Sequence, residues 1–197
     1  MSNLIEPHGG KLCDLFVHKE EKSKIHKESI NLISIMLNDR QLCDIEMLLN
    51  GGFSPLQGFL DKADYESVVE KSRLANGIVW PIPITLDISE EFSKNISTGD
   101  RIVLRDQEGI ALAILNITDK WFPDLLKEAQ TVFGTIDITH PAVDYILNRS
   151  NKVYIGGKIE GLECPRHYDY QLLRHSPLEL RSQFKKMGWS KIVAFQT

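Results

Sequence analysis

The sequence is poor in cysteine and has no long hydrophobic run. Its 197 residues contain only three cysteines, Cys13, Cys43 and Cys164, which lie far apart without CxxC spacing. This pattern argues against a disulfide framework and against a zinc site, and it favours reduced thiols in a cytoplasmic protein. No apolar stretch reaches signal-peptide length at the N-terminus or the roughly 18 residues of a membrane-spanning helix. We therefore expect no membrane partner.

The chain also lacks a large excess of charge of either sign. The net charge is −4 and the pI is about 5.9, so nothing favours general binding to nucleic acid or to anionic lipid. Basic residues do not cluster with aromatic ones, as they do in nucleic-acid-binding domains. There is no GxxxxGK[ST] phosphate loop, no GxGxxG turn and no H-x-x-H pair. The sequence thus predicts no metal site and no nucleic-acid partner.

Helix signals are present in the first third of the chain. Asn38 can cap a helix with Gln41 as the return partner of a capping box, and Gly51-Gly52 can end that helix. A second short helix is predicted over 63–72. His140 and His175 are interpreted as loop or cap residues rather than as ligands, and His8 is interpreted as a packed loop residue.

Strand signals follow from about residue 79. The stretch 79–89 has two prolines, which suit an extended edge strand. A hairpin is predicted over 100–121, with Ile110, Leu112 and Ile114 on one face and two alanines on the other. The stretch 152–162 is a further strand, in which Gly156-Gly157 indicates a bulge or a close backbone approach. An α+β fold is expected, with the sheet closed into a small antiparallel barrel because closure removes exposed edges.

The pattern changes again near residue 168. Ser176, Pro177 and Glu179 predict a capped helix, and Gly188 ends it. The apolar residues 192–195 then resemble a strand buried on both faces, as at the start of a parallel α/β layer. We therefore predict two units, 1–168 and 169–197.

Seven stretches, in order along almost the whole chain, resemble one family. The sequence is similar to ATP sulfurylase (sulfate adenylyltransferase), in its N-terminal domain and the opening of its catalytic domain. The stretches are PHGGKL (7–12), LNDRQLCDIEMLLNGGFSPLQGFL (37–60), PIPITLDIS (81–89), GDRIVLRD (99–106), VFGTIDITHPAV (132–143), YIGGKIEG (154–161) and LRHSPLELRSQFKKMGWSKIVAFQT (173–197).

The resemblance implies both a fold and an activity. The fold is a PUA-like β-barrel with flanking helices over 1–168, followed over 169–197 by the start of an α/β nucleotide-binding domain. The activity is transfer of AMP from ATP, with Mg²⁺, to sulfate, giving adenosine 5′-phosphosulfate and pyrophosphate. Gln196 matches the glutamine that contacts sulfate, and Thr197 matches the threonine of the family's catalytic segment. The family commonly forms homo-oligomers.

The chemistry asks for more groups than these two residues supply. Sulfate and ATP repel each other, so converging guanidinium groups, other donors and a metal ion must neutralise the charge. The family's arginine, asparagine and H-x-x-H histidines would follow Thr197. We therefore expect the chain alone to be nearly inactive.

Two other functions stay open. A PUA-like domain can act as a binding module for RNA, although the charge of −4 speaks against this. The chain can also be a scaffold or oligomer contact. In that case the apolar stripe of Leu180, Phe184, Met187 and Val193 needs cover, which predicts self-association or a mobile tail.

Overall fold

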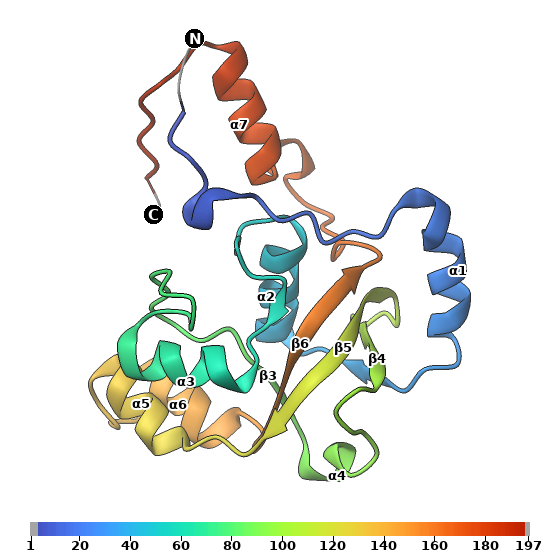
Figure 1. Cartoon of the computed structure of the whole chain (residues 1–197), viewed down its shortest axis with the longest axis vertical. Coiled ribbons are helices and arrows are strands. Elements are labelled where there is room, and N and C mark those ends of the chain that lie inside the picture. The colour runs from blue at the N-terminus through green and yellow to red at the C-terminus, as the bar shows by residue number, and fades with distance from the viewer. Residues whose placement is uncertain (1–3, 196–197) are drawn as a thin grey trace.

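The computed structural model describes residues 4–195, and Figure 1 shows the arrangement of its elements. The α-helices are α1 (Lys19–Ser29), α2 (Asp39–Leu49), α3 (Lys62–Lys71), α4 (Glu90–Ser93), α5 (Leu125–Phe133), α6 (Pro141–Asp144) and α7 (Pro177–Lys186). The strands are β1 (Ser34–Met36), β2 (Gly58–Phe59), β3 (Leu86–Ile88), β4 (Arg101–Arg105), β5 (Ala111–Trp121) and β6 (Val153–Gly161). Short turns lie at η1 (His8–Gly10), η2 (Tyr145–Arg149, a π-helical turn) and η3 (Gln171–Leu173).

The sheet is open, so the expected closed barrel is wrong. Its six strands have the order β1-β4-β5-β6-β2, and β3 also pairs with β6. All pairs are antiparallel except β1 with β4. The edge strands β1 and β2 have only three and two residues. Such short edges expose few unpaired backbone groups, so the edges need no closure.

The predicted hairpin forms from β4 and β5, but its facing differs from the prediction. The register shifts between Leu104 and Arg105. Leu112 therefore packs in the main core, whereas Ile114 packs in a second cluster with Ile25 of α1. A bulge that inserts one residue breaks the strict alternation that the sequence suggested.

Gly156 and Gly157 in β6 make the close approaches predicted for them. A Cβ added at Gly157 would lie 2.0 Å from the backbone oxygen of Asn116, and one at Gly156 would lie 2.0 Å from that of Leu60. The facing strand β5 shifts register between Ile117 and Asp119 at this point. The sheet can be this tight only where there is no side chain.

Helix α2 begins as predicted. The Asn38 side chain accepts from the backbone N–H of Gln41, and the Gln41 side chain accepts from the N–H of Asn38, which completes the capping box. Ile45, Leu48 and Leu49 are buried in the main core. The helix is thereby fixed against the sheet with its first turn at the edge of β3 (Figure 1).

The C-terminal part is only partly as predicted. Helix α7 has the predicted cap, with Ser176 and Glu179 forming a capping box. Residues 190–195 form no strand, and Val193 and Phe195 are 94% and 89% exposed. A strand needs a neighbour for its backbone hydrogen bonds, and no strand in residues 4–195 takes that place. The predicted division at 168 stays a prediction.

Helix α7 stands apart from the sheet, near the N-terminal segment (Figure 1). None of its residues is buried. Within residues 4–195, every helix is too short or too polar to cross a membrane.

Candidate binding cavity

A cavity of about 440 Å³ lies between α2, β3, α5, α6 and β6. One part of its wall is apolar, and another part is built from charged and hydroxyl-bearing side chains. The apolar part consists of Ile82, Pro83, Ile84, Phe133, Pro141, Ala142 and Ile146. The polar part consists of Arg40, Asp44, Thr85, Asp87, Glu128, Tyr145, Ser150 and Tyr154. A cavity of this size and mixed lining has the character of a small-molecule site.

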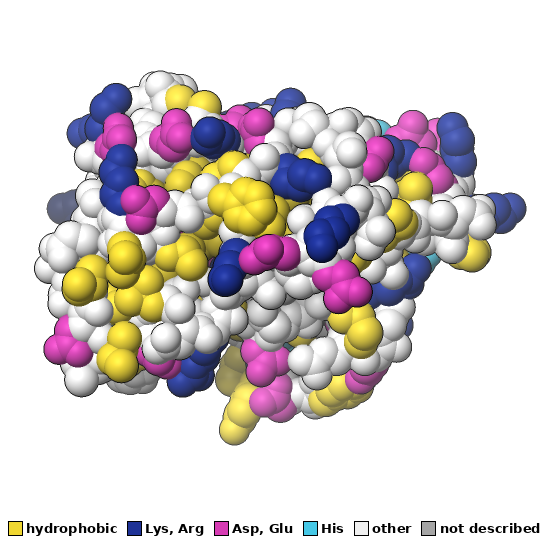
Figure 2. Space-filling view, turned by 90° about the horizontal axis from the view of Figure 1, so that it is seen from below, with side chains coloured by type: hydrophobic (Ala, Val, Ile, Leu, Met, Phe, Trp, Pro, Cys, Tyr) yellow, Lys and Arg dark blue, Asp and Glu magenta, His cyan; other side chains and the backbone are white. Residues whose placement is uncertain are grey.

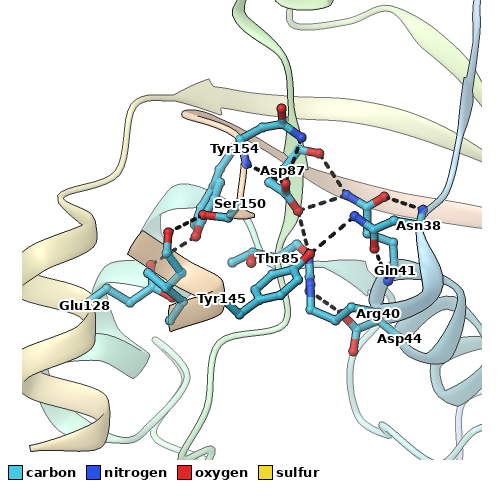
Figure 3. A network of polar contacts seen from close by, with 12 residues as sticks. Asn38, Arg40, Gln41, Asp44, Thr85, Asp87, Glu128, Tyr145, Ser150 and Tyr154 are labelled. Atoms are coloured by element: carbon cyan, nitrogen blue, oxygen red, sulfur yellow. Dashed lines mark hydrogen bonds and ion pairs between the residues drawn. The ribbon is translucent and has the colours of Figure 1, made fainter. Parts of the chain in front are cut away.

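Arg40 organises the polar part of the wall (Figure 3). The Asn38 cap places it in the first turn of α2, and Asp44 follows one turn later on the same face. Its Nη1 donates to Asp44 Oδ2 at 2.5 Å, and its Nη2 donates to Asp87 Oδ1 at 2.6 Å. Both nitrogens also donate to the Thr85 carbonyl at 3.2 Å. The guanidinium thus joins α2 to β3.

The ring of Tyr145 lies beside the same guanidinium. The Arg40 Cζ atom is 5.3 Å from the ring centroid, which is cation–π distance. Burial opposes the charge of Arg40, yet Asp44 and Tyr145 raise its pKa above the usual value. Arg40 is therefore charged at every accessible pH, but two carboxylates already neutralise it. Its buried Nε has no partner among the described residues.

Asp87 and Asp44 share that guanidinium but differ in their other partners. Asp87 is 1% exposed and also accepts from the Gln41 side chain and from the backbone and side-chain nitrogens of Asn151. Burial opposes ionisation, but these hydrogen bonds and Arg40 hold the pKa of Asp87 below its usual value. Within residues 4–195 the Asp44 side chain accepts only from Arg40, and burial raises the pKa of Asp44 to about 6. At neutral pH both groups are ionised.

Glu128 forms a second polar group in the wall. The Asp124 cap starts α5 and places Glu128 one turn into the helix, where it is 3% exposed. Its Oε2 accepts from the Tyr65 hydroxyl at 2.9 Å and from the Tyr154 hydroxyl at 3.3 Å. Burial raises the pKa of Glu128, although both hydrogen bonds work against that rise. Burial beside Glu128 also raises the pKa of both tyrosines.

Hydrophobic side chains also lie on the outer surface near this cavity. They gather on the side of the molecule that holds α5 and α6 (Figure 2). Phe122, Leu126 and Ile136, in or beside α5, are 70%, 59% and 52% exposed. These three side chains do not line the cavity itself.

The predicted site residues Gln196 and Thr197 lie outside the described residues. The structure instead brings together side chains that the sequence reasoning missed. A usable signal was Asp87 itself, an acid between Leu86 and Ile88 in a stretch already predicted as a strand. A buried acid in such a strand needs a cationic partner. Glu128 gave no such signal.

His140 is a cap residue as predicted, whereas His8, predicted as a packed loop residue, is exposed. His140 is the N-cap residue of α6. His8 is exposed, and its Nε2 lies 2.8 Å from the Val79 carbonyl. The described residues hold no group of three or more His, Cys, Asp or Glu side chains that could bind a metal ion.

Comparison with known protein families identifies the domain family of the chain. A family model described as a PUA-like domain matches residues 5–164. The chain therefore belongs to the PUA-like domain family, with an open sheet in place of the expected barrel.

The similar full-length proteins are sulfate adenylyltransferases. That of Eremothecium gossypii is 48% identical over 195 residues, which cover 98% of this chain and 39% of the relative. That of Schizosaccharomyces pombe is 47% identical over 178 residues, covering 89% and 36%. A solved structure, the hexameric APS kinase from Thiobacillus denitrificans, has a TM-score of 0.75 at 33% identity, covering 94% of this chain and 32% of the other. The chain thus spans between about a third and two-fifths of the relatives it matches.

Proposed function

We propose that this chain acts as part of a sulfate adenylyltransferase, which transfers AMP from ATP to sulfate and releases pyrophosphate. The similarity to the Eremothecium gossypii enzyme, 48% over 98% of the chain, carries this proposal. A nucleotidyltransferase of this kind needs cationic groups to hold two polyanions together. On this proposal the chain contributes the PUA-like domain, and most of those cationic groups come from elsewhere in the enzyme.

Two residues of the chain take part in substrate binding on this proposal. Gln196 orients a sulfate oxygen through its amide, and Thr197 adds a hydroxyl to the catalytic segment. Mg²⁺ bound to ATP would offset the negative charge of the leaving pyrophosphate. The cavity at Arg40 is not the substrate site, since Asp44 and Asp87 already neutralise the guanidinium.

A chimera tests the proposal directly. Residues 1–197 replace the matching segment of the Eremothecium gossypii enzyme, and pyrophosphate release is measured with ATP, Mg²⁺ and sulfate. We expect a rate within about 10-fold of the parent, because exchanged segments at this identity keep their core packing. The chain alone should release no pyrophosphate above background. A folded chimera without activity, or turnover by the chain alone, would refute the proposal.

The same chimera tests the residue assignment. Gln196→Ala should raise the KM for sulfate, because it removes an amide that orients that substrate, and should leave the KM for ATP nearly unchanged. Equal effects on both substrates would contradict the assigned role.

A contact role within an oligomer is a second function that one observation favours. Leu178, Met187 and Trp189, in and beside α7, are 64%, 49% and 50% exposed. Exposed apolar side chains of this size commonly mark a contact surface. The similar APS kinase from Thiobacillus denitrificans is hexameric. Light scattering of the chain at several concentrations should reveal association, and a monomer at all concentrations would contradict this role.

A further inference from the structure

The cavity beside Arg40 carries groups that the proposed AMP transfer does not use. We propose that it binds a small organic ammonium ion, an amine on a compact apolar body. The ammonium contacts Glu128, and the body contacts the apolar wall.

The charges of the wall favour a cation. Arg40 supplies one positive charge, and its guanidinium is held by Asp44 and Asp87 at 2.5 and 2.6 Å. Glu128 then adds a carboxyl group that no cationic side chain among the described residues contacts. A phosphate, sulfate or carboxylate would face three carboxyl groups, so an anionic ligand is disfavoured.

Glu128 has an oxygen left for a ligand. Both hydrogen bonds that it accepts, from Tyr65 and Tyr154, end on Oε2. Its Oε1 accepts from no side chain among the described residues and is not one of the buried atoms that lack a partner, so this oxygen is open to the cavity that Glu128 lines. An ammonium N–H is the donor that binds a carboxylate oxygen facing a partly apolar cavity most strongly, because the hydrogen bond is charge-assisted.

The remaining wall defines the body of the ligand. Phe133, Pro141 and Ile146 offer only carbon surface, and the cavity of about 440 Å³ is large enough for one ring and a short chain. A bare metal ion fits poorly, because the described residues hold no cluster of three ligating side chains. A strongly hydrated polyamine would leave this apolar wall uncovered.

The experiment uses three probes of nearly equal size with the 197-residue chain: 2-phenylethylammonium, neutral 2-phenylethanol and anionic 3-phenylpropanoate. Binding is followed by ¹⁵N–¹H chemical shifts and calorimetry at pH 7.5. The ammonium should bind saturably and at least about 10-fold more tightly than the alcohol, which is the ratio expected of one charge-assisted hydrogen bond. The carboxylate should bind more weakly than the alcohol.

Two variants locate the site. Glu128→Gln should weaken ammonium binding about 10- to 100-fold and leave the alcohol nearly unchanged, since only the charge is lost. Ala142→Phe fills the cavity from its wall and should abolish binding of both probes. Thermal unfolding of each variant shows whether it is folded; if Glu128→Gln is not, the probe ratio on the unchanged chain decides.

Three results would overturn the proposal. The first is equal affinity of the chain for the ammonium and the alcohol. The second is the absence of saturable ammonium binding at concentrations up to about 10 mM, since a dissociation constant above that value is too weak for a specific site. The third is unchanged ammonium binding in a folded Ala142→Phe variant. None of these results bears on AMP transfer, because the chimera assay tests that function separately.

Discussion

Replacing Asp87 by asparagine should destabilise the protein strongly. The amide has nearly the same shape as the carboxylate, so the change removes the charge and one acceptor but leaves no cavity. Asp87 accepts from Arg40, Gln41 and two nitrogens of Asn151 at 2.6 to 3.0 Å. In either orientation the new NH₂ group faces at least one donor. Breaking one side of a buried ion pair costs about 3–5 kcal/mol.

Asp44→Asn is the matched control, because it makes the same chemical change in the other carboxylate that pairs with the Arg40 guanidinium. Asp44 has Arg40 as its recorded hydrogen-bond partner, and burial raises its pKa to about 6. The loss of the ion pair is therefore offset by relief from burying a charge. We expect its free energy of unfolding to change by less than about 1 kcal/mol at pH 7.

Urea unfolding followed by tryptophan fluorescence measures both changes. Trp121 reports on the core, since its ring lies 5.5 Å from that of Tyr65. The pH dependence supplies a second check. The lowered pKa of Asp87 gives stability that is present above its unfolded pKa and is lost as pH falls, so the Asp87→Asn difference should shrink toward pH 3. Equal losses for the two variants at pH 7 would refute the reasoning.

The remaining predictions concern backbone, cap and charge. Gly157→Ala should lower the free energy of unfolding by more than about 3 kcal/mol or prevent folding, because its Cβ would lie 2.0 Å from a backbone oxygen. Gly77 also has a positive φ, near +90°, but open space around it, so Gly77→Ala should lower the free energy of unfolding by only about 1 kcal/mol, as measured by urea unfolding. Ser176→Ala should lower the helicity of α7 in circular dichroism by removing a cap worth about 1 kcal/mol, with the main unfolding midpoint unchanged, because α7 buries nothing. The raised pKa of Glu128 means that its contribution to stability falls as pH rises above about 4.5, so Glu128→Gln should flatten that decline in a series of thermal unfolding curves; an unchanged slope would contradict this.

Local signals in the sequence predicted the elements that depend on local chemistry. Asn38 with Gln41 and Ser176 with Glu179 formed the predicted capping boxes, because a cap needs only residues three apart. The hairpin turn was confirmed for the same reason, and the close approach at Gly157 was confirmed although its partner, Asn116, is distant in the sequence. The family assignment came from seven motifs in order, which no single periodicity supplies.

Features that depend on distant residues were missed. The barrel prediction was wrong because strand count does not determine whether the first and last strands meet. The strand at 192–195 was wrong because hydrophobicity indicates burial but supplies no neighbouring strand. Arg40 meets Asp87, 47 positions away, only through the packing of α2 against β3. No pattern in the sequence joins those two positions.

The segment before α1 is hydrogen-bonded to β6, the last strand in the sequence. Val17 donates to the Gly161 carbonyl, and Gly161 donates to that of Leu15. During synthesis, the hydrogen bonds of residues 15–17 to Gly161 can form only after about 145 further residues have left the ribosome. The pairing of β5 with β6, which has the longer register of its two pairings, is delayed in the same way. Strand β4 already pairs with one edge of β5, so the other edge of this apolar strand stays open until β6 has been made.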